Sequence, residues 1–177
     1  FSTYWQHAWL ATAEAREQEQ FWQSYLQNSQ QYLAVPGQKA LLPDSDESKV
    51  TEAAVFVLNA DVREKLLSLS HAKRGSLFTV LYSGFCVLMS RITGETDFNI
   101  GIPVSGRNMP ETQSMMGFFL NNLPVRNRVH GAQSFNDLLT EQVANLESVL
   151  SHQELPFERI VELCSEPRSA NDNEPPL

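Results

Sequence analysis

One stretch of the chain alternates strictly between apolar residues and small or polar residues. The apolar positions are Phe98, Ile100, Ile102 and Val104, and between them stand Asn99, Gly101 and Pro103. A period of two predicts a β-strand with one apolar face. Glycine and proline on the opposite face present almost no side chain, and glycine in a strand often marks the close approach of another group to the backbone. The plainer reading is a buried strand that ends in a turn. The strand is expected to end in a loop at residues 105–108.

The N-terminal part of the chain has helical periodicity. Residues 1–28 are predicted to form one long leading helix, with aromatic residues near both ends and a charged, helix-favouring stretch at 14–20. We therefore expect the helix to be anchored at its ends and solvated in its middle. Residues 29–50 lack periodicity and contain proline and glycine, which predicts an exposed connector.

Two further helices are predicted before the alternating strand. The first starts at Asp61, whose side chain suits a helix N-terminus, and ends at Gly75. Ser76 caps the second, which covers residues 77–92 and is ended by Gly94. Apolar residues lie nearly all round this second helix, so we expect it to be buried in the core.

Three more segments have clear patterns. Ala53–Leu58 is a continuous apolar run, typical of a strand covered on both faces. If this strand lies beside the alternating strand, the two should be parallel and joined by a right-handed crossover. Residues 120–129 are extended by pattern, and Pro124 makes them an edge strand or a crossing segment. Residues 134–150 repeat apolar positions at threes and fours, which predicts an amphipathic helix.

Composition narrows the function classes. Hydrophobic residues make up 42% and charged residues 19% of the 177 residues, a balance typical of a globular domain. The net charge of −8 argues against nucleic-acid binding, which needs a basic patch. No apolar run reaches the roughly 18 residues of a membrane span, and no secretory signal stands at the start, so we expect a cytoplasmic protein.

Cysteine, histidine and serine patterns point to no metal or nucleophile site. Cys86 and Cys164 are the only cysteines, and each lies in an apolar helical pattern, so buried free thiols are expected. The four histidines have no zinc-ligand spacing. Ser105 has no nearby histidine and acid to activate it, so we assign it no catalytic role.

Four ordered segments together resemble the condensation domains of non-ribosomal peptide synthetases, which belong to the chloramphenicol-acetyltransferase-like superfamily. The segments are residues 91–97, 101–107, 116–126 and 152–158. The motif residues, to which we assign structural roles, are Gly94, Asp97, Gly101, Pro103, Gly106, Gly117, Pro124, Arg126, His152, Gln153, Pro156, Phe157 and Glu158. Residues 167–169 and 176–177 weakly resemble the last motif of the family. The resemblance covers almost the whole chain.

The resemblance implies a fold and a place in it. It implies an α/β lobe with a mixed sheet flanked by helices and one long N-terminal helix. Residues 1–177 would be the second, C-terminal lobe of a condensation domain, incomplete and part of a larger polypeptide. Residues 1–28 would lead from the first lobe towards the second. Residues 105–127 would leave their own lobe as a loop that floors the tunnel between lobes.

The resemblance also implies a reaction. Condensation domains form an amide bond between an acyl or peptidyl thioester and an aminoacyl thioester, both delivered on the phosphopantetheine arms of upstream and downstream carrier domains. The lobe would bind no cofactor directly. The family's catalytic element, His-His-x-x-x-Asp-Gly, is absent here, since the chain has no adjacent histidine pair. We therefore assign no catalytic residue and expect the lobe to be inactive without the N-terminal catalytic lobe.

Two residues are candidates for the substrate tunnel or the contact between lobes. Arg107 could pair with a carboxylate or carbonyl across the tunnel, although a surface loop arginine is the plainer reading. Asn122 could bridge donors and acceptors near the reacting groups, or bond only to backbone. Asn121 is less well placed, because it lies on the opposite face of an extended segment. His152 is expected to be a packing or capping residue.

Other readings stay open. The chain could belong to another acyltransferase of the superfamily that uses free or coenzyme A thioesters. It could also be a non-catalytic lobe that only docks carrier proteins. Without its partner lobe, a fragment of this kind would expose the apolar residues 115–120, so we expect self-association through them.

Overall fold

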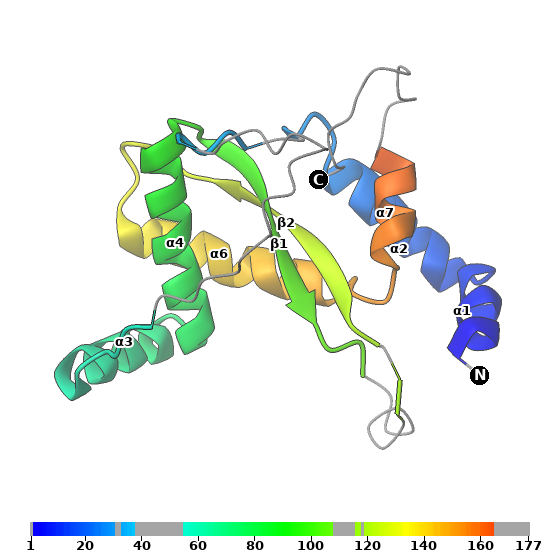
Figure 1. The fold of residues 1–177 in the computed structure, drawn as a ribbon, viewed down its shortest axis with the longest axis horizontal. Helices are drawn as coiled ribbons and strands as arrows, with labels where there is room; N and C mark the ends of the chain where they lie inside the picture. The colour runs from blue at the N-terminus through cyan, green and yellow to red at the C-terminus, as the bar shows by residue number, and fades with distance from the viewer. Residues whose placement is uncertain (1, 31–32, 38–54, 108–115, 118, 165–177) are drawn as a thin grey trace, which may run out of the picture.

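The computed structural model describes residues 2–30, 33–37, 55–107, 116–117 and 119–164. Its elements follow the order α1, α2, α3, α4, β1, β2, α6 and α7. In Figure 1 the two strands lie in the centre, with α4 on one side and α1, α2 and α7 on the other. The helices are α1 (Ser2–Leu10), α2 (Ala13–Tyr25), α3 (Ala60–Ala72), α4 (Leu77–Thr93), α6 (Phe135–Leu150) and α7 (Phe157–Cys164).

The alternating stretch forms a strand, as predicted. β1 (Asp97–Val104) pairs antiparallel with β2 (Asn121–Arg128), from Asp97 opposite Arg128 to Val104 opposite Asn121. The apolar face of β1 points into the core, where Phe98 and Ile102 are buried. Burying such a face is the main favourable term in folding.

The core lies between the strands and the helices around them. α4, α6 and α2 each contribute buried residues, and α6 begins at the predicted cap, where the Ser134 hydroxyl accepts a hydrogen bond from the Asp137 N–H. The apolar cluster contains Trp9, Trp22, Cys86, Phe98, Leu123, Val125, Leu146, Val149, Leu155 and Ile160. Residues distant in sequence therefore meet in one core.

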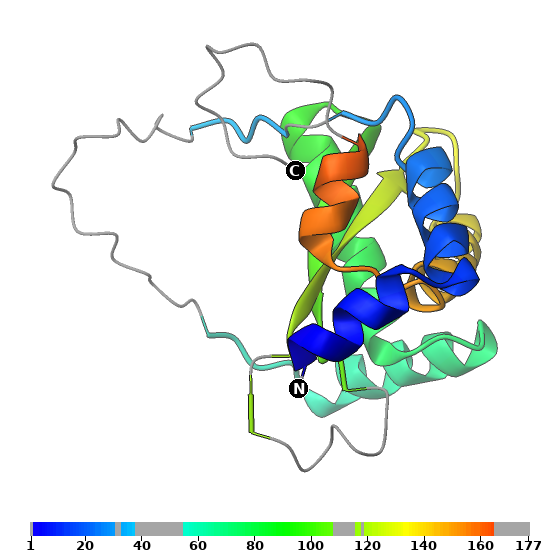
Figure 2. The ribbon, with the colours of Figure 1, turned by 90° about the vertical axis from the view of Figure 1, so that its right-hand side faces the viewer.

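The predicted single N-terminal helix is in fact two helices. The Thr12 hydroxyl accepts a hydrogen bond from the Ala15 N–H at 3.2 Å and donates to the Trp9 carbonyl at 2.7 Å, so it caps α2 and bonds to the end of α1. The expected solvated middle is also wrong, because Ala15 and Gln18 are buried. Figure 2 shows α7 alongside α2, which explains this burial.

The predicted end residues are found at α4, whereas both ends of α3 differ from the prediction. Ser76 makes a capping box at the start of α4, and Gly94 ends it with a left-handed φ of 79°. α3 is capped by Asn59 rather than Asp61, and it ends at Ala72, before Gly75. Among the described residues no single helix is long and apolar enough to cross a membrane, although α3 and α4, bent by 100°, pass that test as a pair.

The expectation that α4 is buried all round is wrong. One face, with Val80, Ser83 and Cys86, packs into the core. The opposite face carries apolar residues spaced three and four apart, and Leu88 there is 51% exposed. The exposed residues of this face are Phe78, Leu81, Phe85, Leu88 and Ile92. No described segment of the chain covers them.

The predicted strand at 53–58 is not formed in its described part. Val55–Leu58 has no strand structure, and Val57 is 90% exposed. The described sheet has two antiparallel strands, so the expected parallel crossover is absent from it. An apolar run becomes a buried strand only where other elements cover both faces, and no described element covers this one.

Other predictions fall partly outside the described residues. In the connector, Ser29 and Gln30 accept hydrogen bonds from the Asn99 amide, so the start of this segment lies against β1. Residues 121–127 of the predicted floor loop form β2 and pair with β1. The rest of that loop at 108–115, and the weak motif at 167–169 and 176–177, lie outside the described residues.

Candidate functional site

The end of the strand pair at Val104 and Asn121 holds the predicted site residues. We call this the strand-end site; it comprises residues 104–107, 117, 119 and 121–122 and the loop 151–156. Arg107 lies in it, half-buried, with its guanidinium 4.4 Å from the centre of the Phe119 ring and 3.3 Å from the Gly117 carbonyl. This guanidinium therefore joins the two strands of the hairpin beyond their last paired residues.

The backbone geometry at Gly106 explains why this motif position needs glycine. Its φ is 61°, in the left-handed region. A Cβ at this position would also collide with the Phe119 carbonyl oxygen. Backbone thus approaches backbone at the base of the loop, and only glycine permits both features.

Asn121 is the residue that joins the strand-end site together. Its amide nitrogen donates to the carbonyls of Gln153 at 3.0 Å and Leu155 at 2.9 Å. Its side-chain oxygen accepts from the N–H groups of Asn122 and Phe157, both at 3.0 Å. Sequence reasoning set this residue aside in favour of Asn122. The available signal was its period-two relation to Leu123, which places it on the core face.

Asn122 and, on the facing strand, Gly101 and Pro103 are exposed. Asn122 lies opposite Pro103, and its side chain points away from the core. Gly101, opposite Pro124, is exposed, and nothing lies within 4 Å of where its Cβ would be. The expected close backbone approach at Gly101 is therefore absent from the described residues. A tunnel role for Asn122 stays a prediction.

The loop 151–156 is held by α2 on its other side. The His152 ring stacks on Phe21, with centroids 3.7 Å apart and planes 3° apart, and its Nδ1 lies 2.7 Å from the Ser148 carbonyl. The Trp22 indole N–H donates to the His152 carbonyl at 3.0 Å. The Leu155 N–H donates to the Gln18 side chain at 3.0 Å. His152 therefore lies packed between Phe21 of α2 and the end of α6.

The remaining motif residues around α7 also have local structural contacts. The Gln153 amide donates to the Leu150 carbonyl at 2.7 Å. Pro156 precedes α7 and accepts from the Ile160 N–H at 3.1 Å, so it stands at the cap rather than inside the first turn as predicted. Glu158 lies in the first turn and is exposed, where an acidic side chain interacts favourably with the helix dipole.

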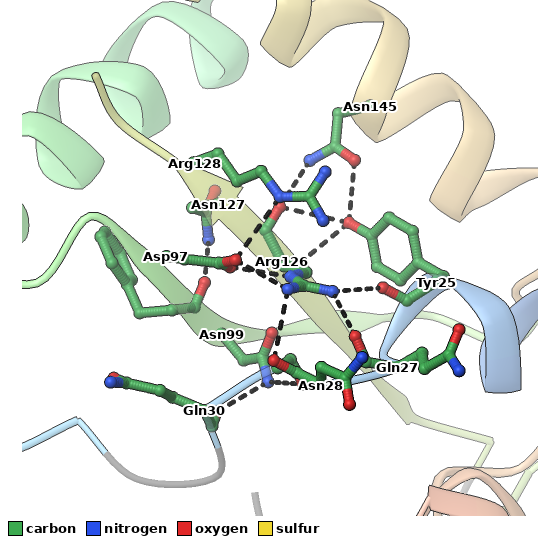
Figure 3. Close-up of polar contacts among 12 residues, drawn as sticks. Tyr25, Gln27, Asn28, Gln30, Asp97, Asn99, Arg126, Asn127, Arg128 and Asn145 are labelled. Carbon is green, nitrogen blue, oxygen red and sulfur yellow. Dashed lines mark hydrogen bonds and ion pairs between the residues drawn. The ribbon is translucent and has the colours of Figure 1, made fainter.

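A second polar cluster lies at the other end of the strands, around Arg126 (Figure 3). The guanidinium makes a bidentate pair with Asp97, with both N–O distances 2.7 Å. This pairing holds the pKa of the Asp97 carboxyl below its usual range and raises the pKa of Arg126. Burial raises the pKa of the neighbouring Tyr25 to about 12. These motif residues are thus tied to one another and to the end of α2.

Cys86 belongs to a buried polar group on the core face. Its thiol donates to the Asn127 side-chain oxygen at 3.2 Å, and the Gln142 amide donates to the same oxygen at 3.1 Å. Burial raises the pKa of Cys86 to about 12, so the thiol is unreactive as a nucleophile. Cys164 is only half-buried, so the predicted burial of both thiols is confirmed for Cys86 alone.

The chemistry available in the strand-end site is hydrogen bonding and positive charge. Asn122 and Arg107 offer an amide and a guanidinium. The imidazole of His152, the one histidine of the site, is stacked on Phe21 and bonded to a carbonyl. In the described ranges no group of three or more His, Cys, Asp or Glu side chains could hold a metal ion. The described groups of the site are suited to positioning polar partners.

Comparison with known proteins identifies the family. The family model for the condensation domain matches residues 1–175. One of the linear gramicidin synthase proteins of Brevibacillus parabrevis is 31% identical over 166 residues, which cover 94% of this chain and 3% of that protein. The malpinin synthetase of Mortierella alpina is 29% identical over 164 residues, which cover 93% of this chain and 2% of that protein. The chain thus spans a small part of these curated relatives.

Solved structures agree on the fold. The X-domain from teicoplanin biosynthesis matches with a TM-score of 0.81 at 20% identity, over 93% of this chain and 37% of that one. The first condensation domain of the CDA synthetase matches with a TM-score of 0.72 at 18% identity, over 91% and 34%. These likenesses show the predicted chloramphenicol-acetyltransferase-like α/β fold. With the family model matching nearly every residue, this chain belongs to the condensation-domain family of non-ribosomal peptide synthetases.

Proposed function

We propose that residues 1–177 serve as the second lobe of a condensation domain that forms an amide bond between two carrier-bound thioesters. In this reaction the amine of an aminoacyl thioester attacks the carbonyl of an acyl or peptidyl thioester, and the thiol of the donor arm leaves. The chain itself would shape the tunnel between the lobes and position the reacting groups. The proton-handling histidine pair would come from a lobe that carries His-His-x-x-x-Asp-Gly.

The observation that carries this proposal is the strand-end site. Its motif residues are built into one hydrogen-bonded unit through Asn121, which fixes the strand ends beside the loop 151–156. Arg107 and Asn122 emerge from that fixed unit at the same end of the strand pair. A pre-organised polar rim of this kind can orient a substrate or a second lobe without moving during the reaction.

The test is a reconstitution. The segment would be produced with its native upstream sequence, and amide formation would be assayed between acyl-loaded and aminoacyl-loaded carrier proteins. Product from the longer protein and none from residues 1–177 alone is the expected result. Absence of product from the longer protein, with loading of both carriers verified by mass spectrometry, would contradict the proposal.

Substitutions then test the site. Arg107→Ala and Asn122→Ala in the longer protein are expected to lower the rate of amide formation while leaving the folded state intact, because both side chains stand outside the core. Product formed from free or coenzyme A thioesters, with no need for carriers, would favour the alternative acyltransferase. Carrier binding without turnover would favour the docking lobe.

A further inference from the structure

A single arginine ties the end of α2 to both strands. All five guanidinium N–H directions of Arg126 have an acceptor, and its side chain is only 9% exposed. Two of them bind the Asp97 carboxylate. The others bind the carbonyls that end α2 and follow it: Tyr25 at 3.2 Å, Gln27 at 2.8 Å and Asn28 at 3.5 Å. Figure 3 shows these groups converging on the guanidinium.

The backbone of Arg126 is held by the same helix end. Its N–H donates to the Tyr25 hydroxyl at 2.9 Å, and that hydroxyl donates to the Asn145 side chain at 2.8 Å. The Asn145 amide in turn donates to the Arg126 carbonyl at 3.0 Å. Both the backbone and the side chain of one residue therefore fix α2 against β2 and α6.

α2 has a second attachment to the same strand. Further towards its N-terminus, Gln18 and Trp22 bond to the loop 151–156, and that loop bonds to Asn121 at the other end of β2. The helix is thus joined to β2 near both ends of the strand: directly at Arg126, and through the loop at Asn121. A helix held at two separated points can rotate only about the line that joins them, whereas a helix held at a single point can rotate about any axis through it.

We propose that Arg126 is a positioning residue that locks α2 to the strand pair, so that the N-terminal helices and the strand-end site move as one rigid body. This role rests on the proposed function, since its purpose would be to hold the strand-end site in fixed register with whatever precedes α2. Replacing the Arg126 side chain removes its bonds to Asp97 and to the α2 carbonyls but leaves the Tyr25 hydroxyl on the Arg126 backbone, the Glu19–Arg159 pair and the attachment at the loop. The α2 end nearest Arg126 is therefore the end expected to gain motion.

The chain offers a matched control on the same strand. Arg128 also approaches Asp97, at 3.5 Å, but its side chain is 59% exposed, and within the described residues no hydrogen bond joins it to α2. Arg126→Gln and Arg128→Gln therefore remove the same charge from neighbouring positions. Arg126→Lys keeps a positive charge beside the Asp97 carboxylate. The lysine ammonium cannot bond to all five acceptors, because it carries only three donors on a single atom.

The test uses the complete condensation domain, with Cys164→Ser and pairs of spin labels at exposed sites. Labels at Gln23 and Glu147 report the α2 end near Arg126, and labels at Glu14 and Glu158 report the end near the loop. In Arg126→Gln we expect a broadened distance distribution for the first pair only. We also expect at least a tenfold lower kcat for amide formation with KM for the carriers within twofold. Arg126→Lys should fall between, and Arg128→Gln should match the wild type.

Unchanged distances and rates in folded Arg126→Gln, equal to those of Arg128→Gln, would overturn the proposal. So would broadening of both label pairs, which would indicate general destabilisation. If Arg126→Gln does not fold, Arg126→Lys decides by the same two readouts. If the wild-type domain makes no amide, the proposed function fails, and the label distances still decide whether Arg126 locks α2.

Discussion

Two regions of this molecule contain similar apolar residues, which are buried in one region and exposed in the other. Around α2, β2 and the loop 151–156, the apolar side chains are buried and the nearby polar groups are bonded to one another. On α4 and at Val55–Leu58, apolar side chains of the same size face outward. The difference shows that burial depends on a complementary surface supplied elsewhere in the chain, and not on the apolar content of a segment.

The largest expected effect separates the two regions directly. Leu123→Ala removes a fully buried side chain from β2 and should lower the free energy of unfolding by about 2–5 kcal/mol. Leu88→Ala makes the same chemical change on the exposed face of α4, where the effect should stay within about 0.5 kcal/mol. Urea unfolding followed by circular dichroism measures both. Equal losses for the two variants would mean that the α4 face is covered in solution.

A smaller difference in stability is expected between alanine substitutions of the two neighbouring asparagines. Asn121→Ala leaves the Leu155 carbonyl and the Phe157 N–H without their partners and should cost about 1–3 kcal/mol. Asn122→Ala changes an exposed side chain and should cost no more than about 0.5 kcal/mol. The midpoints of thermal unfolding compare them. The ordering would be wrong if Asn122→Ala proved the more destabilising change.

The pH dependence of stability tests the Arg126 cluster. Because the pKa of Asp97 is lower in the folded state, its contribution is complete above the unfolded value of about 4 and is lost as pH falls through the folded pKa. Asp97→Asn should therefore be less stable than the wild type at pH 7, and the difference should shrink below about pH 4. Since the carboxylate is partly exposed, we expect a difference of only about 1 kcal/mol. A difference that does not change between pH 7 and pH 3 would contradict this assignment.

The weakest effect concerns self-association of the 177-residue chain. Met116 is fully exposed and Leu120 half-exposed, which keeps the sequence-based prediction for residues 115–120 open. The face of α4 is a second exposed apolar surface. Light scattering across a concentration series, with Met116→Ser and Leu88→Ser as separate variants, shows which surface associates. A wild-type chain that stays monomeric throughout would remove the prediction for both.

Local signals in the sequence predicted local features well. The period of two located β1, and Ser76, Ser134 and Gly94 mark helix ends as predicted. These features depend on hydrogen bonds between residues three or four apart, or on the alternation of one strand, so a single segment contains the information.

The predictions that failed depended on distant partners. The break at Thr12 occurs in a sequence without proline or glycine. α2 then packs against α7, which lies near the other end of the described chain. The importance of Asn121 comes from backbone groups at 153–157. Exposure of the α4 face depends on which surfaces lie nearby. The apolar periodicity of one segment contains no information about these contacts with distant segments.

The contact at Gly106 has a practical consequence for engineering. Because the backbone at Gly106 meets the Phe119 carbonyl, and Arg107 bonds to the Gly117 carbonyl, the segment between them begins and ends at one fixed closure. A replacement for residues 108–116 would have to keep Gly106, Arg107, Gly117 and Phe119, which make this closure. We expect a segment exchanged under that condition to leave β1 and β2 paired in the present register, from Asp97 opposite Arg128 to Val104 opposite Asn121.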